Sequence, residues 1–205
     1  QTNSTLQAPL IQQLMQQDDL PTEAIPILTA AVKESVVSPE SLLGIISLLL
    51  RNNNPDVFPS VLDAIVTLQR CPGARQQQKL ARVALLASPV LQNHAGLLSE
   101  RLRAEASGPG GEWYAACLLT IASDRKSEQE PRDRSLHALN QAWQQAAGRH
   151  AIIQAVSSTK LPIMNDRLLA ASNDPDKRIQ QLAKSTIKRL GIRHEGEDTT
   201  QRIED

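Results

Sequence analysis

The sequence predicts an all-α fold built from about five pairs of helices. Three observations support this prediction: the apolar residues are mostly aliphatic, helix-start signals recur along the chain, and those signals are regularly spaced. The 205 residues include only two Trp, one Tyr and one Phe, so Leu, Ala, Ile and Val must fill the interior. Such an interior suits packed helices better than a β-sandwich, and the chain is long enough to bury a substantial core.

The stretch 168–191 shows the clearest pair of helices. It reads as the end of one helix, a turn at 172–174 and a second helix that Pro175 opens. We expect Asp174 to cap the second helix and Gly191 to end it. Spacings of three and four residues predict one buried stripe on that helix. The stripe consists of Ile179, Leu182, Ala183, Thr186, Ile187 and Leu190.

Similar signals divide the rest of the chain into helices. Ser38-Pro39-Glu40 opens a helix that is apolar on most sides and is therefore expected to be central. Pro59 would lose a hydrogen bond inside a helix, so regular helix is expected from Pro59 rather than from Pro55. The other predicted helices span 6–17, 21–36, 75–87, 89 to about 102, 112–123, 131–146, 151–156 (a short piece) and 163–171.

Apolar stripes predict the buried faces of two of these helices. In the helix at 75–87 the predicted stripe is Leu80, Val83, Ala84 and Ala87. In the helix that Pro131 opens it is Leu136, Leu139, Trp143 and Ala146.

Prolines open every second predicted helix, at separations of 34, 34, 42 and 44 residues. A charged loop and the short helical piece account for the two longer separations. A helix-turn-helix unit that recurs at this spacing is typical of α-solenoids. The prolines are Pro21, Pro55, Pro89, Pro131 and Pro175.

The stretch 168–190 resembles a HEAT-type (armadillo-like) repeat. It has a Leu-rich first helix, an Asn/Asp-Pro-Asp turn, the basic pair Lys177-Arg178 and Ala183 at a close-packing position. The segment 54–56 and its flanks form a weaker copy, so about a quarter of the chain matches well. The resemblance implies an α/α superhelix, a HEAT-like solenoid of about five helix pairs, with the second helices lining one surface.

We expect a single helical-repeat domain over residues 1–192. The glycine-rich segment 107–111, SGPGG, is a candidate hinge within it. Residues 193–205 have no apolar period and are expected to form a disordered tail.

Charge and hydropathy argue against two classes of function. Lys plus Arg and Asp plus Glu both number 22, so the formal net charge is zero. Nucleic-acid-binding proteins usually carry a basic excess, which argues against that role. The apolar stretch 45–50, interrupted by Ser47, is far too short to cross a bilayer, so no membrane insertion is expected.

No catalytic, cofactor or metal motif occurs in the chain. The phosphate-binding patterns GxxxxGK[ST] and GxGxxG and the nucleophile elbow GxSxG are absent. The histidines at 94, 137, 150 and 194 lack metal-ligand spacing and are expected at the surface or at helix edges, with His150 capping carbonyls. Cys71 and Cys117 are expected to be buried thiols, although a disulfide between them stays open. We therefore expect no enzyme activity, no cofactor and no small-molecule substrate.

The leading hypothesis is a non-catalytic scaffold that binds a protein partner on the surface of its second helices. Two alternatives stay open. One is an accessory helical domain of a larger enzyme, since the chain begins at Gln1 and resembles segments of some exported bacterial redox enzymes. The other is a HEAT-like DNA-binding protein or glycosylase, which the neutral charge disfavours. The candidate partner-binding residues are Arg178, Gln181, Lys184, Ser185 and Lys188 in the last unit, and Ser60, Asp63 and Thr67 in the second.

Overall fold

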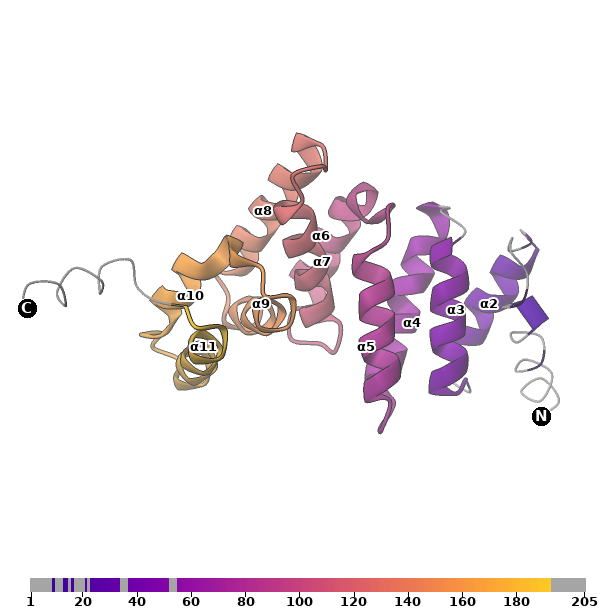
Figure 1. The fold of residues 1–205 in the computed structure, drawn as a ribbon, viewed down its shortest axis with the longest axis horizontal. Helices are drawn as coiled ribbons and strands as arrows, with labels where there is room; N and C mark the ends of the chain where they lie inside the picture. Colours follow the sequence, from indigo (N-terminus) through magenta and orange to yellow (C-terminus); the bar gives the residue numbers. More distant parts are fainter. Residues whose placement is uncertain are drawn as a thin grey trace, which may run out of the picture.

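In the computed structural model of the chain, the described residues form ten α-helices that pack against one another (Figure 1). The structure describes residues 9, 13, 14, 16, 21, 23–33, 37–51 and 55–192, and these residues contain no β-strand. The predicted all-α fold is therefore confirmed for the described part. The α-helices are α2 (Ala24–Lys33), α3 (Pro39–Arg51), α4 (Phe58–Arg70), α5 (Arg75–Leu86), α6 (Ala95–Glu105), α7 (Gly111–Ser123), α8 (Gln129–Ala142), α9 (Ala146–Thr159), α10 (Asn165–Ala171) and α11 (Lys177–Leu190). The short 3-10 helices are η1 (Pro55–Val57), η2 (Leu91–His94) and η3 (Pro162–Met164).

Two predicted segments lie largely or wholly outside this description. In the predicted helix 6–17, Pro9, Gln13 and Leu14 are helical, and the Leu14 side chain is buried. The predicted tail, 193–205, lies outside the described residues.

Each helix makes its extensive contacts with the next helix in the chain or with the one after it. The helices α3, α5, α7, α9 and α11 contact one another in series, and we call them the first row. In the second row, α2 packs on α4 and α6 packs on α8. As a result, α2 and α11 lie at opposite ends of the molecule (Figure 1).

The segment 146–159 forms a complete helix, α9, and not the short piece predicted at 151–156. Its pattern is hard to read because Gly148, Ala151 and Ala155 are buried along with the larger apolar residues, so no single stripe stands out. The interval from Pro131 to Pro175 therefore contains one helix more than each earlier interval. In consequence the helix after Pro175, α11, belongs to the first row, whereas α4, after Pro55, belongs to the second.

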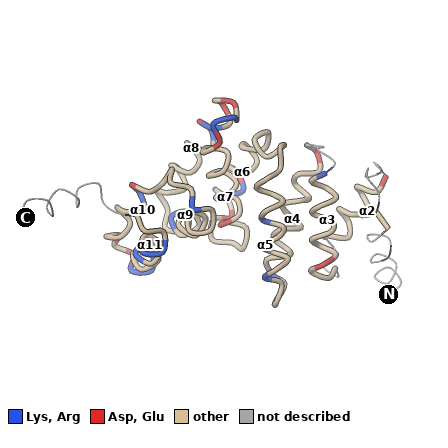
Figure 2. Tube along the Cα trace, in the orientation of Figure 1, with Lys and Arg blue, Asp and Glu red and all other residues tan. Residues whose placement is uncertain are grey.

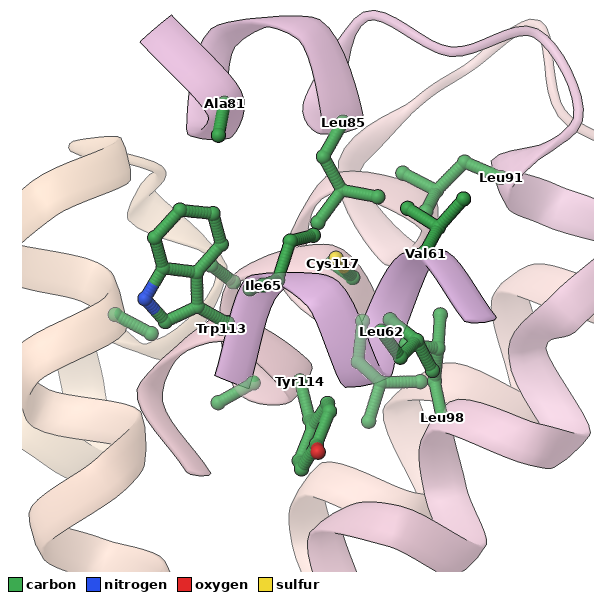
Figure 3. Packing of buried hydrophobic residues seen from close by; sticks show 14 of the residues in the cluster. Val61, Leu62, Ile65, Ala81, Leu85, Leu91, Leu98, Trp113, Tyr114 and Cys117 are labelled. Carbon is green, nitrogen blue, oxygen red and sulfur yellow. The ribbon is translucent and has the colours of Figure 1, made fainter. Parts of the chain in front are cut away.

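The core is centred on α7, which is buried on almost every side. Ten of its 13 residues are buried, including Trp113, Tyr114 and Cys117. Side chains of α4, α5, η2 and α6 converge on this helix (Figure 3). Burial raises the pKa of the Cys117 thiol to about 12, which keeps it protonated. Cys71 and Cys117 are both free, so the disulfide that was left open is not formed.

Polar groups also connect the two rows. The Arg101 guanidinium of α6 lies 3.2 Å from Oδ1 of Asp63 on α4 and 3.0 Å from Oε1 of Glu105. The hydroxyl of Tyr114 on α7 donates to Oε2 of Glu105 at 3.3 Å. Burial and the neighbouring carboxylate raise the pKa of Tyr114 well above its usual range, so its proton stays available for this bond. One chain of polar contacts thus joins α4, α6 and α7.

The helix beginnings agree only partly with the proline signals. Pro39 begins α3, and Oγ of Ser38 accepts the Ser41 N–H at 3.2 Å, as predicted. Regular helix begins at Phe58, next to Pro59 and not at Pro55, also as predicted. However, α8 begins at Gln129, two residues before Pro131.

Two other prolines lie in turns and not at the first helical position. A turn and η2 separate Pro89 from α6, and Pro175 precedes the cap of α11. The fixed φ of proline suits turns as well as the first helical turn, which explains the displacement. Prolines therefore locate the approximate starts of helices here, and the capping geometry decides the boundary.

The buried face of α5 is not the predicted one. Leu80 is 49% exposed and Val83 is 61% exposed, whereas Ala81 and Leu85 are buried. The neighbouring inward positions carry long polar side chains that find partners. Nε2 of Gln78 donates to the Leu68 carbonyl at 3.1 Å, and the Arg82 guanidinium lies 4.8 Å from the centre of the Trp113 ring. Because the inward positions of α5 carry these polar side chains, the prediction from apolar periodicity placed the wrong side of the helix in the core.

Close backbone approach explains the glycines in segment 107–111. A Cβ on Gly111 would lie 2.2 Å from the Ala106 carbonyl oxygen, and one on Gly110 would lie 2.6 Å from the Tyr114 ring. The segment is thus a tight turn that lets α7 pack on α6. The hinge expected here stays a prediction.

His94 is buried, which corrects the expectation of a surface or helix-edge position. Its ring stacks on Phe58 with centroids 3.9 Å apart and planes 2° apart. Nε2 has no hydrogen-bond partner among the described residues, and burial lowers the pKa of the imidazole. His94 therefore packs as a neutral ring between η2 and α4.

The carbonyl groups at the end of α8 accept hydrogen bonds from a residue other than the predicted His150. Nη1 of Arg149 donates to the carbonyls of Trp143 and Gln144, both at 3.3 Å. The adjacent His150 is exposed. The capping role expected of His150 thus belongs to Arg149.

The Gly111→Ala variant is expected to be less stable by about 1–3 kcal/mol, because the added Cβ meets a backbone oxygen that has little freedom to move. Gly96→Ala is the matched control, since its Cβ would lie 3.4 Å from the flexible end of Arg134. The control should be neutral or more stable by up to about 1 kcal/mol. Urea unfolding measures both, and equal stability of the two variants would contradict the close-approach argument.

The free energy of unfolding is expected to fall as pH drops below 6.5, the ordinary pKa of histidine. Below this pH the imidazole of His94 is protonated in the unfolded chain but stays neutral in the folded protein, so protonation favours unfolding. Above this pH the contribution of His94 to the free energy of unfolding does not change with pH. The variant His94→Phe retains an aromatic ring stacked on Phe58 but cannot bind a proton, so the free energy of unfolding should change less between pH 7.5 and 5.5. The control is His137→Gln, at an exposed position, which should leave this pH dependence unchanged. Urea titrations at several pH values measure the slopes.

Candidate functional site: the basic face of the last helix

The last helix, α11, has well-defined ends. Asp176 is the N-cap, and its Oδ1 accepts the Arg178 N–H at 2.9 Å. Gly191 takes a left-handed conformation with φ of 66°, and the Ile192 N–H donates to the Ile187 carbonyl at 3.2 Å. The stop at Gly191 is as predicted. The expected cap is wrong by two residues, because Asp176 and not Asp174 caps the helix.

Asp174 instead anchors the turn before α11. Its Oδ2 lies 2.9 Å from Nε of Arg149, with the two side chains 8% and 20% exposed. Its Oδ1 accepts the Asp176 N–H at 2.9 Å. Since Arg149 also holds the end of α8, this pair fixes α11 relative to α8 and α9.

The predicted apolar stripe of α11 faces its neighbours. Ile179, Ala183 and Thr186 are buried. The other three stripe residues are half-buried. The stripe packs against α9 and α10, so the opposite side of the helix faces solvent.

The solvent side of α11 carries five positive charges, and the helix contains no acidic residue. Figure 2 shows these charges gathered on α11 at one end of the molecule. Exposed Gln181 and Ser185 lie among them. We call this surface the basic face, and its cations are Lys177, Arg178, Lys184, Lys188 and Arg189.

Four of these cations make no ion pair with any described residue, and Arg189 donates to the Ser157 carbonyl. Other arginines are neutralised: Arg82 pairs with Glu112 at 2.8 Å, and Arg134 pairs with Glu130. The basic face is therefore a concentration of unpaired positive charge on a chain whose net charge is zero. The predicted partner-binding residues Arg178, Gln181, Lys184, Ser185 and Lys188 all lie on it.

The structure does not add the predicted α4 residues to this surface. Oγ of Ser60 accepts a hydrogen bond from Thr29 at 3.3 Å, Asp63 pairs with Arg101, and Thr67 bonds to its own helix backbone. These side chains are thus engaged within the fold. Moreover, α4 and α11 belong to different rows and lie far apart along the molecule (Figure 1).

A groove of about 420 Å³ between α6 and α8 was not predicted from the sequence. Its floor is formed by small or apolar residues such as Gly96, Leu102 and Ala138, and Glu100 and Arg103 are exposed at its edge. Small residues spread over two helices gave no local signal for it. Ser99 and Glu100 are among its lining residues, but Oγ of Ser99 donates to the Ala95 carbonyl at 2.6 Å and not to the carboxylate.

Two further findings limit the chemistry of the described part of the chain. Within it, no three or more His, Cys, Asp or Glu side chains gather in a way that could hold a metal ion. No described helix is long and apolar enough to cross a membrane.

Comparison of the chain with known proteins gives no match to a family model, to a curated protein or to a solved structure. Inference about function therefore rests on the basic face itself.

Asp174→Asn is expected to reduce the free energy of unfolding by about 2–3 kcal/mol, because it leaves the largely buried Arg149 charge without its partner. Asp166→Asn, at an exposed position of α10, is the control and should change stability by less than about 0.5 kcal/mol. Hydrogen exchange should show the loss of protection concentrated in α11. A uniform loss across all helices would contradict the anchoring role.

Proposed function

We propose that the protein is a non-catalytic helical-repeat scaffold that binds an acidic segment of a protein partner on the basic face of α11. The observation that supports this proposal is the set of unpaired cations on one exposed helix surface. A positive surface of this kind steers and orients a negatively charged partner.

The contact pattern supports a solenoid as the architecture of this scaffold. In solenoids each unit contacts only its neighbours, and here extensive contacts stop at the second helix along the chain. The same HEAT-like reading gives five pairs, from α2 with α3 to α10 with α11. The last pair differs from the earlier ones because its first helix, α10, has only seven residues, and terminal repeats are commonly atypical.

The size of the basic face suits an extended peptide. A helix of 14 residues is about 21 Å long, which about six or seven extended residues would cover. Gln181 and Ser185 lie between the cations and offer hydrogen bonds to a peptide backbone. Carboxylates of an acidic segment would pair with the lysines and arginines on either side.

Two observations favour a polypeptide over a nucleic acid. The chain as a whole has no basic excess that would attract a polyanion from a distance. In addition, Phe58, Trp113 and Tyr114 are buried and Trp143 is half-buried, so the described part of the chain has no fully exposed Phe, Tyr or Trp ring on which a base could stack.

The double variant Lys184→Glu/Lys188→Glu tests the proposal. The probe is a fluorescent deca-glutamate peptide at low ionic strength, measured by anisotropy. Exposed ion pairs contribute roughly 0.2–1 kcal/mol each. Replacing two attractions with two repulsions should therefore weaken binding about tenfold.

The control is Arg75→Glu/Lys79→Glu, which makes the same charge change at exposed positions of α5 and should bind like the unaltered protein. Equal weakening in both variants would show only a general charge effect and would reject α11 as the site. Tighter binding of a 20-base-pair DNA duplex than of the peptide, lost in the α11 variant, would assign the face to nucleic acid instead.

A further inference from the structure

We propose that residues 193–205 of this chain bind back onto the basic face of α11 and compete there with an external acidic partner. This inference rests on the proposed function for its regulatory meaning, but the intramolecular contact is tested separately.

Charge complementarity is the first argument. The segment that follows α11 contains five acidic residues and only two arginines, Arg193 and Arg202. It is thus net negative, while the helix before it is wholly positive among its charged residues. The acidic residues are Glu195, Glu197, Asp198, Glu204 and Asp205.

The end of α11 supplies the second argument. Left-handed Gly191 and the bond from the Ile192 N–H to the Ile187 carbonyl form a Schellman-type ending. This ending holds Ile192 beside the last turn of the helix, where Lys188 and Arg189 are exposed. Glu195 follows Ile192 by three residues, about 10 Å of extended chain, so it can reach these cations.

Length is the third argument. The 13 residues of 193–205 can span about 43 Å when extended, twice the length of α11. If the segment returns antiparallel to the helix, Glu195 and Glu197 meet Lys188 and Lys184, and the last carboxylates can reach Lys177 and Arg178. The segment is therefore long enough for its carboxylates to reach cations at both ends of the helix.

Covalent linkage makes this weak contact effective. Each exposed ion pair is weak on its own, but a short linker gives an effective concentration in the millimolar range. The segment would therefore exclude weakly binding acidic peptides and yield to a partner of higher charge density. Salt would release it, since the ion pairs would form on the exposed side of α11.

Zero-length carbodiimide crosslinking of the unaltered protein, followed by mass spectrometry, tests the contact itself. At an ionic strength of about 20 mM, where screening is weak, amide links should join Lys184 or Lys188 to Glu195, Glu197 or Asp198 in the monomer. These links should disappear at about 0.5 M salt. Crosslinks from the same carboxylates to Lys79 and Lys126 in equal yield would overturn the proposal.

Binding of deca-glutamate tests the competition. The variant Glu195→Gln/Glu197→Gln/Asp198→Asn should bind the peptide about three- to tenfold more tightly, because the competing segment has lost its charge. Glu100→Gln/Glu128→Gln/Asp133→Asn makes the same charge change at exposed positions of α6, of the loop between α7 and α8, and of α8, and should leave the affinity unchanged. An equal gain in both variants would overturn the competition.

The two experiments distinguish a failure of this inference from a failure of the proposed function. Peptide binding at α11 without the specific crosslinks rejects this inference and keeps the proposed function. If the specific crosslinks form but the variant Glu195→Gln/Glu197→Gln/Asp198→Asn does not bind the peptide, the proposed function is rejected and the intramolecular contact is retained.

Discussion

The burial of α7 is the constraint on which the other helices depend. Its neighbours α5, α6, α8 and α9 all pack against it, and ten of its 13 residues are buried. A helix buried on so many sides needs close approach at its beginning, and Gly110 and Gly111 allow it. The remaining helices then extend outward from this centre in both directions along the chain.

Polar contacts fix the orientation of helices that apolar packing alone would leave free to slide. Asp63, Arg101, Glu105 and Tyr114 connect α4, α6 and α7. Arg149 and Asp174 do the same for α8, α9 and α11. Charged groups that are used in this way are neutralised, so they are not available to a partner. The contrast with the unpaired cations of α11 is what makes the basic face a candidate site.

The two sides of α11 have different roles. Its apolar stripe packs the helix against α9 and α10, so the side chains on the opposite side make few contacts within the fold and face solvent. A row of cations there would repel one another without a compensating anion, and either a partner or the acidic segment 193–205 supplies that compensation in our proposals. The proposed regulation depends only on the charges of α11 and of segment 193–205 and on the length of that segment.

The sequence by itself determined the helical class, the burial of most apolar residues of α3, the stripe and stop of α11, and the residues of the basic face. These features depend on local spacing and capping, which a linear pattern records. Only the tertiary structure decided the rest: the inward face of α5, the burial of His94, the full length of α9, and the engagement of Ser60 and Asp63. Each of these depends on a partner distant in the chain. Gln78 and Arg82 turn inward because the Leu68 carbonyl and the Trp113 ring bind them, and Gly148 near the start of α9 lies against Ala142 at the end of α8.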